Sequence, residues 1–382
     1  MSRRICIITG TRAEWGLLQP VAAALRDRAD TELQIVATNM HLDPLYGNTV
    51  DRIIEAGFTV DERVPMPAAA GDEAATVRAI AACMSGMADA FTRLRPDLAV
   101  ILGDRTEMLA TATAAHVMRI PIAHLHGGEI SEGAIDDSLR HAITKLASLH
   151  LTSTEEHRRR VIQLGEDPQM VINAGAIGVW NAMHQPQAPL EELTATLGFV
   201  PDRRTLLVTY HPATLDDGDT AGRCRALLEA LDAFPDSKVI ITYPNNDARG
   251  RVIIDLIEEY GRCNPGRVKV IASLGMRRYL SVLRHIGAVV GNSSSGLIEV
   301  PSAGIPTVDV GIRQRGRCAA ASVIHCGDSS EEICRAIAEA LDRGPGKEAP
   351  NPYYRPDTLR LITEALTATP LERLRHKKFH DL

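Results

Sequence analysis

The stretch Ile5-Cys6-Ile7-Ile8-Thr9, followed at once by Gly10-Thr11-Arg12-Ala13-Glu14-Trp15-Gly16, decides the fold. A short apolar run rich in β-branched residues, then a glycine turn, then a helical pattern is the start of a β–α–β unit. The rhythm recurs along the chain, with amphipathic stretches such as 17–28 and 76–95 between strands, so we predict parallel sheets covered by helices on both faces. The predicted strands are 5–9, 33–37, 58–60, 98–102, 122–125, 149–152, 171–173, 206–209, 239–242, 268–271, 288–290, 307–310 and 323–324.

The chain of 382 residues is long enough for two ordinary domains. We predict an N-terminal lobe over 1–175, an interdomain connection with one helix over 176–201, and a C-terminal lobe over 202–355. A last helix with a solvated polar tail is expected over 356–382. Each lobe should be Rossmann-like, with a doubly wound parallel sheet. Because such sheets bind ligands at the carboxyl ends of their strands, the site is expected in an interdomain cleft.

Composition excludes several classes of function. Lys and Arg number 42 against 48 Asp and Glu, so the net charge of −6 argues against a broad nucleic-acid or membrane-binding surface. Aromatic residues make up 4%, too few for a platform that stacks bases. No apolar run reaches the ~18 residues that span a bilayer, and the run at 5–8 is too short for a signal peptide. Seven scattered cysteines without a Cys-x-x-Cys pair predict a cytoplasmic protein with small buried thiols.

The glycine loop after the first strand carries the first candidate contact. It lacks both the Gly-x-Gly-x-x-Gly fingerprint and a Gly-Lys-Ser/Thr sequence, which argues against NAD and against ATP hydrolysis, so we predict no cofactor. The following helix offers N–H groups to an anion, and Arg12 could face a phosphate there. A plain strand–helix turn with a surface arginine is the alternative.

Acids and histidines follow the strands 98–102 and 122–125. Asp104 follows a buried strand, where a carboxylate is costly unless it is paired, so it is either a site residue or the partner of Arg105. Strand alternation would place His124 and His126 on one face, ahead of Glu129. Such groups suit proton transfer, and without compact ligand spacing we predict no metal site. The candidate catalytic residues are Asp104, His126, Glu129 and Asp136.

In the second half, the stretch 291–299 runs from a strand into a Ser/Gly-rich loop and a helix. Its hydroxyl and N–H groups could hold a diphosphate, and Glu299 could accept hydrogen bonds from ribose hydroxyls. A helix N-cap with spare serines is the alternative reading. The basic loop 309–317 follows another strand and is either a phosphate contact or a solvated loop. The candidate binding residues of this half are His211, Asn245, Ser293, Ser294, Gly296, Glu299 and Arg313.

Together these segments resemble the UDP-N-acetylglucosamine 2-epimerase family, over a range from about residue 5 to residue 325. More narrowly they resemble its hydrolysing branch, which feeds sialic-acid-like and legionaminic-acid-like sugar pathways. The motifs, in the family's order, are Gly-Thr-Arg-Ala-Glu at 10–14, Gly-Asp-Arg at 103–105, His-Leu-His-Gly-Gly-Glu at 124–129, Ile-Asp-Asp-Ser-Leu-Arg-His-Ala-Ile-Thr-Lys-Leu at 135–146, Tyr-Pro-Asn-Asn-Asp at 243–247 and Asn-Ser-Ser-Ser-Gly at 292–296.

The resemblance implies a GT-B fold, in which the N-terminal lobe faces the sugar and the C-terminal lobe holds the uridine nucleotide. It implies removal of the C2 proton, loss of UDP to give a 2-acetamidoglycal, and addition of water to release a free 2-epimeric sugar such as N-acetylmannosamine, without NAD. A nucleotide-sugar substrate and a homodimer or homotetramer are expected from the resemblance alone. By position, Asp104 and Asp136 match acids implicated in proton transfer. Matches to nucleotide or phosphate contacts are Arg12, His211, Ser293, Ser294, Glu299 and Arg313, with Arg105 and Asn245 as further candidates.

One position departs from the sialic-acid members of the family. They usually carry a glutamate, implicated in catalysis, where this chain has His126. The His-x-His-Gly-Gly-Glu form resembles members that act on UDP- or GDP-N,N′-diacetylbacillosamine, so this sugar nucleotide is the alternative to UDP-N-acetylglucosamine, the predicted substrate. A histidine titrates near neutral pH and can still exchange a proton. The other functions that stay open are a GT-B glycosyltransferase, a non-hydrolysing epimerase and a non-catalytic sugar-nucleotide sensor.

Overall fold

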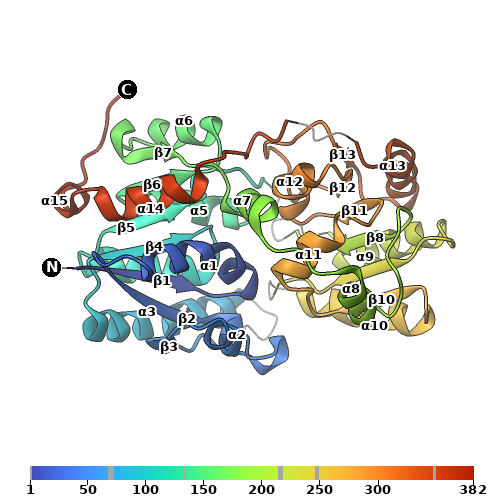
Figure 1. Ribbon diagram of the computed structural model, residues 1–382, viewed down its shortest axis with the longest axis horizontal. Coiled ribbons are helices and arrows are strands. Elements are labelled where there is room, and N and C mark those ends of the chain that lie inside the picture. Colours follow the sequence, from blue (N-terminus) through green and yellow to red (C-terminus); the bar gives the residue numbers. More distant parts are fainter. Residues whose placement is uncertain (1, 68–72, 133, 214–217, 246–248, 347–349) are drawn as a thin grey trace. The chain divides into compact units, whose positions relative to one another are not determined.

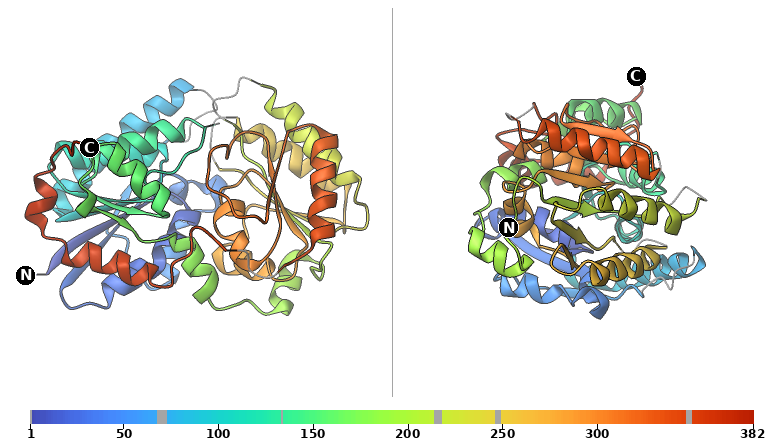
Figure 2. Two further views of the ribbon diagram at one scale, coloured as in Figure 1. Left: turned by 90° about the horizontal axis from the view of Figure 1, so that it is seen from above. Right: turned by 90° about the vertical axis from the view of Figure 1, so that its right-hand side faces the viewer.

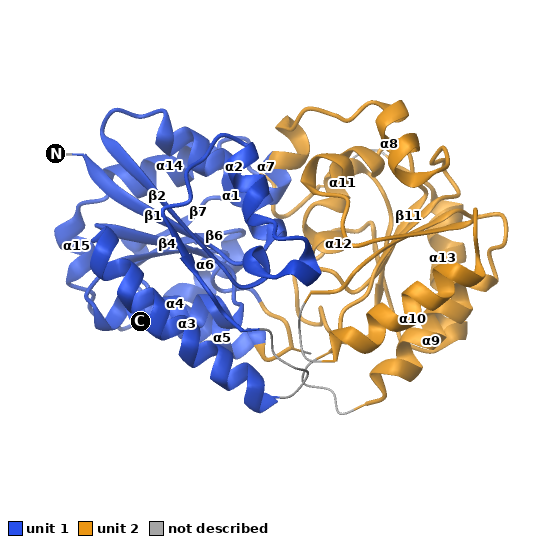
Figure 3. Ribbon diagram, turned by 90° about the horizontal axis from the view of Figure 1, so that it is seen from below, with its two compact units in different colours: residues 1–129, 136–180, 355–382 blue, residues 130–135, 181–354 orange. Residues whose placement is uncertain are grey.

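The computed structural model describes residues 2–67, 73–132, 134–213, 218–245, 249–346 and 350–382, which form two compact units (Figures 1 and 3). Unit 1 comprises Met1–Glu129, Asp136–Trp180 and Arg355–Leu382. Unit 2 comprises Ile130–Ile135 and Asn181–Tyr354. The chain therefore enters unit 2 briefly at 130–135 before its long passage there, and its last segment returns to unit 1.

Unit 1 is built on a parallel sheet in the order β3-β2-β1-β4-β5-β6-β7. One predicted strand is wrong: 58–60 is not a strand, and β3 begins a few residues later. Phe58 instead packs its ring against Trp15, with ring centroids 5.0 Å apart, so the apolar run there reflects burial of a loop. The strands are β1 (Arg3–Thr9), β2 (Thr31–Thr38), β3 (Glu62–Val64), β4 (Leu98–Leu102), β5 (Ile122–Leu125), β6 (Leu149–Thr152) and β7 (Val171–Asn173).

Helices cover both faces of this sheet, as Figure 2 shows. Alternation along β1 divides the core: Ile5 and Ile7 face one apolar cluster, whereas Cys6 and Ile8 face the other. The first cluster includes side chains of α1 (Arg12–Arg26), α2 (Val50–Glu55), α7 (Ile177–His184), α14 (Thr358–Ala368) and α15 (Leu371–Arg375). The second includes α3 (Glu73–Leu94), α4 (Thr106–Val117) and α5 (Asp136–Leu146). The remaining elements are α6 (Glu155–Gln163), η1 (Asn39–Leu42), η2 (Pro44–Tyr46) and η3 (Pro168–Met170).

Unit 2 repeats this architecture with a parallel sheet in the order β10-β9-β8-β11-β12-β13. Leu206 and Val208 of β8 face α9, α10 and α13, whereas Leu207 faces α8 and α11. The prediction of two doubly wound parallel sheets is therefore confirmed. The strands are β8 (Leu206–Thr209), β9 (Val239–Thr242), β10 (Val268–Ile271), β11 (Ala288–Gly291), β12 (Thr307–Val310) and β13 (Val323–Cys326). The helices are α8 (Leu190–Leu197), α9 (Thr220–Asp232), α10 (Gly250–Cys263), α11 (Met276–Val282), α12 (Ser295–Ile298), η4 (Val300–Ala303) and α13 (Ser330–Arg343).

Two expectations about the ends of the lobes need correction. The stretch 176–201 carries both α7 and α8 rather than one helix. The polar tail is not wholly solvated either. Lys377 donates to the carbonyl oxygens of Lys145 (2.6 Å) and Ala147 (2.7 Å) at the end of α5, so this part of the tail is docked on unit 1.

The strand order places the candidate residues. It reverses between β1 and β4 in unit 1, and between β8 and β11 in unit 2. At such reversals the loops that follow the two strands separate and leave room for a ligand. The loops that carry Gly10, Asp104, His211 and Ser293 are those that follow these strands.

Of the seven cysteines, Cys6, Cys83 and Cys224 are buried as expected, whereas Cys263 is exposed and the other three are partly exposed. Among the described helices, none is both long and apolar enough to cross a bilayer.

Candidate active site

Asp104 lies just beyond the carboxyl end of β4 and is held by Arg140 of α5. The guanidinium donates from Nη2 to Asp104 Oδ2, and from Nη1 to Asp137 Oδ1 (3.2 Å) and to the backbone oxygen of Glu129 (2.8 Å). Arg140 is 1% exposed, and its pKa is raised because the surrounding carboxylates outweigh the opposing effect of burial. Asp104 therefore has a partner in Arg140, which lies 36 residues away and which the sequence did not suggest.

His126 and Glu129 form a buried pair directly after β5. His126 Nδ1 lies 2.9 Å from Glu129 Oε1, and the two residues are 8% and 3% exposed. The backbone of His126 is left-handed, with φ 66°, a conformation that costs a non-glycine residue about 1–3 kcal/mol. The other ring nitrogen, Nε2, is buried and has no hydrogen-bond partner among the described residues. An oriented imidazole with one unengaged nitrogen is suited to exchange a proton with a ligand.

The backbone around this pair is tied to three neighbouring elements. His126 N donates to Leu151 O of β6 (2.9 Å), and Arg160 of α6 donates to Gly128 O (2.5 Å). Gly128 has φ 81°, and a Cβ there would lie 2.5 Å from the backbone oxygen of His157, so only glycine fits this close approach. Together with the Arg140 contact, these bonds hold the turn rigidly.

His124 does not share the face of His126, contrary to the alternation we expected. The strand ends at Leu125 and the left-handed turn follows, so the period of two breaks there. His124 instead lies 2.7 Å from Gly103 O through Nε2, and 3.2 Å from Thr144 Oγ1 through Nδ1. Burial lowers the pKa of His124 to about 3, so the ring is neutral and structural.

The loop after β1 is closed by a side chain of the helix that follows it. Glu14 accepts hydrogen bonds from Gly10 N (2.7 Å) and Thr11 N (3.1 Å), so these two N–H groups are occupied by the chain's own carboxyl group. Thr11 and Glu14 complete a capping box at the start of α1. Arg12, the first residue of α1, is half-buried and remains the candidate anion contact of this loop.

Arg105 and Asp136 take different positions around the same sheet edge. Arg105 donates from Nε to Glu107 Oε1 (2.8 Å), and the Glu107 side chain is fully buried. The ion pair with Glu107 gives Arg105 a structural role within unit 1. The contact of Arg105 with a substrate stays a prediction. Asp136 is the first residue of α5, at the positive end of the helix dipole, where a carboxylate is favoured.

In unit 2 the candidate residues are organised by Asn292, which follows β11. Its side chain accepts from His211 N (2.7 Å) and donates to His211 O (2.8 Å), which joins the loops after β8 and β11. Its backbone oxygen accepts from Arg313 Nη1 (3.3 Å) and Gln314 Nε2 (2.8 Å). His211 Nδ1 also accepts from Asn245 N (3.2 Å). Three predicted residues, His211, Arg313 and Asn245, are thus brought together within one unit.

The serine loop has a shorter helix behind it than expected. Helix α12 spans only Ser295–Ile298, with Ser294 as its N-cap and Glu299 at its end, so a helix dipole contributes little to binding an anion here. Ser293 and Ser294 are partly exposed and remain available as hydroxyl contacts. Gly296 has a packing role, because a Cβ there would lie 2.7 Å from Thr307 Cγ2 of β12.

Sequence reasoning missed Arg140 and Asn292. Arg140 lies one helical turn after Asp136 and Asp137, and its full burial could have been suspected only from its place on the apolar side of α5. Asn292 was quoted as part of a motif, but its role depends on His211, which lies 81 residues away in sequence.

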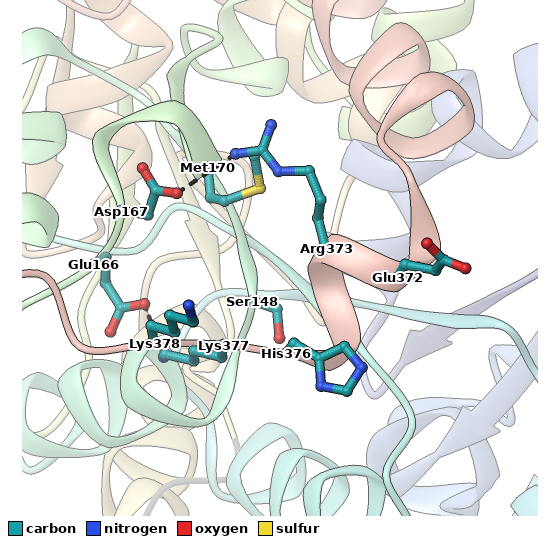
Figure 4. Close-up of a pocket in the computed structure, with 9 residues that line it drawn as sticks. All are labelled: Ser148, Glu166, Asp167, Met170, Glu372, Arg373, His376, Lys377 and Lys378. Carbon is teal, nitrogen blue, oxygen red and sulfur yellow. Dashed lines mark ion pairs between the residues drawn. The ribbon is translucent and has the colours of Figure 1, made fainter.

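A pocket of about 420 Å³ on unit 1 is lined by none of the candidate residues (Figure 4). Four of its charged side chains form two ion pairs: Lys377 Nζ lies 2.7 Å from Glu166 Oε2, and Arg373 Nη2 lies 3.5 Å from Asp167 Oδ2. The pocket lies where the C-terminal tail packs on unit 1, and these ion pairs already neutralise four of its charges. Among the described residues, no group of three or more His, Cys, Asp or Glu is arranged to hold a metal ion.

Two doubly wound parallel sheets are the architecture of the GT-B fold. Here acid and histidine groups follow the strands of one sheet, and hydroxyl and arginine groups follow those of the other. Comparison with known proteins narrows this class. The family model described as UDP-N-acetylglucosamine 2-epimerase matches residues 23–367, and the chain belongs to this family.

Several relatives are similar over their full length. The GDP/UDP-N,N′-diacetylbacillosamine 2-epimerase (hydrolyzing) of Campylobacter jejuni is 35% identical over 382 residues, which cover 100% of this chain and 99% of the relative. The UDP-N,N′-diacetylbacillosamine 2-epimerase (hydrolyzing) of Legionella pneumophila is 34% identical, over 96% of this chain and 98% of the relative. These matches confirm the resemblance to the hydrolysing branch that the motifs predicted.

A solved structure supports the fold. The UDP-GlcNAc 2-epimerase of Neisseria meningitidis, determined with UDP-GlcNAc bound, superposes with a TM-score of 0.78 over 96% of this chain and 100% of that one. At 17% sequence identity, this likeness speaks for the fold alone.

Proposed function

We propose that the protein is a hydrolysing 2-epimerase that converts a nucleoside-diphosphate 2-acetamido sugar and water into the free 2-epimeric sugar and the nucleoside diphosphate. The observation that carries this proposal is the full-length similarity to relatives named as hydrolysing 2-epimerases. The buried His126–Glu129 pair supports it, because proton transfer at carbon needs an oriented base.

The chemistry explains why acids and anion contacts are needed together. The C2 hydrogen is a very weak acid, so the C1–O bond must weaken as the base removes the proton. The C2–H electron pair becomes the C1=C2 double bond, and the C1–O pair leaves with the diphosphate. A proton is then added at C2 and a water oxygen at C1. Inversion at C2 takes a proton from one face and returns it to the other, so two proton-transfer groups are expected.

The residues divide between these tasks. In the proposal His126, with Asp104 or Asp136, acts at C2 of the sugar. Arg12 and the unit 2 group formed by His211, Ser293, Ser294 and Arg313 stabilise the negative charge that develops on the leaving diphosphate. Glu299 and Asn245 contact the nucleoside.

For the substrate, two observations favour a UDP- or GDP-N,N′-diacetylbacillosamine over UDP-N-acetylglucosamine. The Campylobacter and Legionella relatives are named for that sugar. The His-x-His-Gly-Gly-Glu form at 124–129 also resembles members that act on it. UDP-N-acetylglucosamine, with N-acetylmannosamine as product, is the second candidate, since a relative of Neisseria meningitidis that is 31% identical is named UDP-N-acetylglucosamine 2-epimerase.

The test is incubation in deuterated water with UDP-N-acetylglucosamine, UDP-diacetylbacillosamine and GDP-diacetylbacillosamine, without an acceptor. We expect one diacetamido donor to release free sugar with deuterium at C2, identified by NMR and mass spectrometry. Release of the epimeric UDP-sugar would indicate a non-hydrolysing epimerase. Failure of all three donors to release a nucleoside diphosphate would refute the proposal.

A further inference from the structure

A chain of hydrogen bonds runs behind His126, away from its unengaged nitrogen. Glu129 Oε1 lies 2.9 Å from His126 Nδ1 and accepts from Ser153 Oγ at 2.7 Å. Ser153 Oγ lies 2.9 Å from Nδ1 of His157, the third residue of α6. Ser153 and His157 are each 1% exposed, so these hydrogen bonds behind His126 are shielded from solvent. Neither residue was singled out in the sequence.

The donors and acceptors of this chain fix where its hydrogens lie. The carboxylate oxygen of Glu129 can only accept, so both His126 Nδ1 and Ser153 Oγ must donate to it. Ser153 has one hydroxyl hydrogen, and it is used in that bond. In the hydrogen bond between Ser153 and His157, the donor must therefore be His157 Nδ1–H and the acceptor Ser153 Oγ. It follows that neutral His126 carries its hydrogen on Nδ1 and a lone pair on Nε2.

We propose that Ser153 and His157 are positioning residues that hold Glu129 and, through it, fix His126 in the tautomer whose Nε2 accepts the C2 proton of the sugar. This inference rests on the proposed function and assigns His126 the role of base. When Nε2 takes the proton, the C2–H pair enters the C1=C2 bond, and Glu129 stabilises the imidazolium that forms. The proton that returns to C2 from the opposite face then comes from a different group.

The backbone supports this role for α6. Thr154 caps the helix through His157 N (3.1 Å), and Arg160 of the same helix binds Gly128 O. Helix α6 is therefore attached to the turn that carries His126 through the Arg160 side chain. The Thr154 cap fixes the first turn of the helix, where His157 lies. An oriented partner behind a catalytic histidine sets its tautomer, and disturbing such a partner commonly lowers the rate without affecting binding.

The kinetic test compares Ser153→Ala, His157→Leu and His157→Asn with the wild type. Loss of the Ser153 hydroxyl frees the Glu129 carboxylate to move away from His126, which weakens both its hold on the Nδ1–H tautomer and its stabilisation of the imidazolium. We expect kcat to fall about 10-fold, with KM changed less than about 2-fold, and the acidic limb of the kcat/KM profile to move to lower pH. His157→Asn keeps an amide donor near the position of Nδ1 and should retain more activity than His157→Leu.

Other charged or titratable groups face this pair and must stay in place for the profile to be interpreted. They are Arg140 and, through it, Asp104 and Asp137 on one side, and His157 and Arg160 of α6 on the other. The control is Ser237→Ala, which changes a buried serine of unit 2 and should leave both kcat and the profile unchanged. A loss of kcat that is equal at every pH would show that Ser153 only supports the fold and would overturn the inference.

A second measurement does not require turnover. With 15N-labelled histidine, the ring shifts of neutral His126 should report the Nδ1–H tautomer in the wild type and a mixture of tautomers in Ser153→Ala. If the wild type shows the Nε2–H tautomer, the inference fails even when the enzyme is active. If the tautomer is as expected but no donor releases a nucleoside diphosphate, the proposed function fails instead.

Discussion

At the scale of single residues, Glu14 is the most perturbed acid that no proposed step uses. Burial and the neighbouring Glu107 carboxylate raise the pKa of Glu14 to about 8, from an ordinary value of 4.5. The folded protein then binds more protons than the unfolded chain between about pH 4.5 and pH 8, so stability falls as the pH rises through this window.

Glu14→Gln should remove this loss, because a glutamine oxygen can still accept from Gly10 N and Thr11 N. We expect the variant to match the wild type near pH 5 and to exceed its Tm by about 2–4 °C at pH 8, as for a change of ~1 kcal/mol. Thermal unfolding between pH 5 and pH 8 measures the effect. Glu191→Gln changes an exposed acid of α8 and should keep the wild-type slope. An unchanged slope for Glu14→Gln would show that the carboxyl is not a source of the pH dependence.

Asp104 gives the second prediction at this scale. Asp104→Asn keeps the shape of the side chain but replaces the charge that Arg140 binds, so we expect turnover to fall about 10²–10⁴-fold. UDP affinity, measured by calorimetry, should stay within about threefold of the wild type, as a mutation that removes only a transition-state interaction would leave it. Asp89→Asn, on the exposed side of α3, is the matched control. If Asp104→Asn turned over at the normal rate, Asp104 would belong to the fold and not to the reaction.

The sequence could reveal which residues are polar at strand ends, but not all of their partners. The sequence offered Arg105 as one partner of Asp104 but gave no sign of Arg140, which lies 36 residues away and binds it. Likewise the partners of the Glu14 side chain, the N–H groups of Gly10 and Thr11, were not predicted. In both cases the choice among several chemically suitable partners depends on tertiary packing, which local patterns do not encode.

At the scale of elements, strands were predictable because each is a short apolar run between turns. The error at 58–60 arose because Phe58 lies in a loop and is nevertheless buried. A buried apolar residue in a loop gives the same sequence pattern as a strand. The end of β5, at the candidate site, is a second place where the sequence pattern does not predict the backbone. The left-handed backbone of His126 cannot be read from alternation, although the two glycines that follow it do signal a turn.

The tail supports helix α5, which begins with Asp136. Lys377 Nζ donates to two carbonyl oxygens at the end of the helix and pairs with Glu166 at 2.7 Å, as Figure 4 shows for the pair. A cation at this end of a helix is favourable. Although burial alone would raise it, the hydrogen bonds from His150, Lys145 and Lys377 lower the pKa of Glu166 to about 2. The stabilisation is therefore present above about pH 4.5 and is lost as the pH falls toward 2.

Lys377→Met should reduce the free energy of unfolding by about 1–3 kcal/mol at pH 7, since it removes a partly buried charge from a network. The difference from the wild type should shrink as the pH falls from 5 toward 3, because Glu166 is then increasingly protonated in the unfolded chain. Lys378→Met changes an exposed neighbour and should have little effect. Chemical unfolding at several pH values measures all three proteins. Equal stability of the two variants would mean that the tail contacts do not hold α5.

At the scale of the whole molecule, the chain leaves unit 1 after Glu129 and returns at Asp136, both candidate catalytic residues. Between them, 130–135 belongs to unit 2. There Arg317 Nη2 donates to Ser131 Oγ (2.9 Å), and Glu132 N donates to Arg315 O (3.3 Å). The basic loop after β12, which the sequence offered as a phosphate contact or a solvated loop, thus anchors the segment that joins two candidate acids. No pattern in the sequence predicts this anchor.

Because both ends of 130–135 carry candidate catalytic residues, a looser anchor should disturb their positions. Ser131→Ala removes the side-chain hydrogen bond, worth about 1 kcal/mol, and we expect kcat to fall about fivefold if this energy is used for positioning. Ser329→Ala is the contrast, since it removes the N-cap of α13 and should lower Tm with kcat unchanged. Steady-state kinetics and thermal unfolding of both variants separate the two effects. If Ser131→Ala kept the wild-type kcat, the hydrogen bond of Ser131 would not contribute to positioning the candidate catalytic residues.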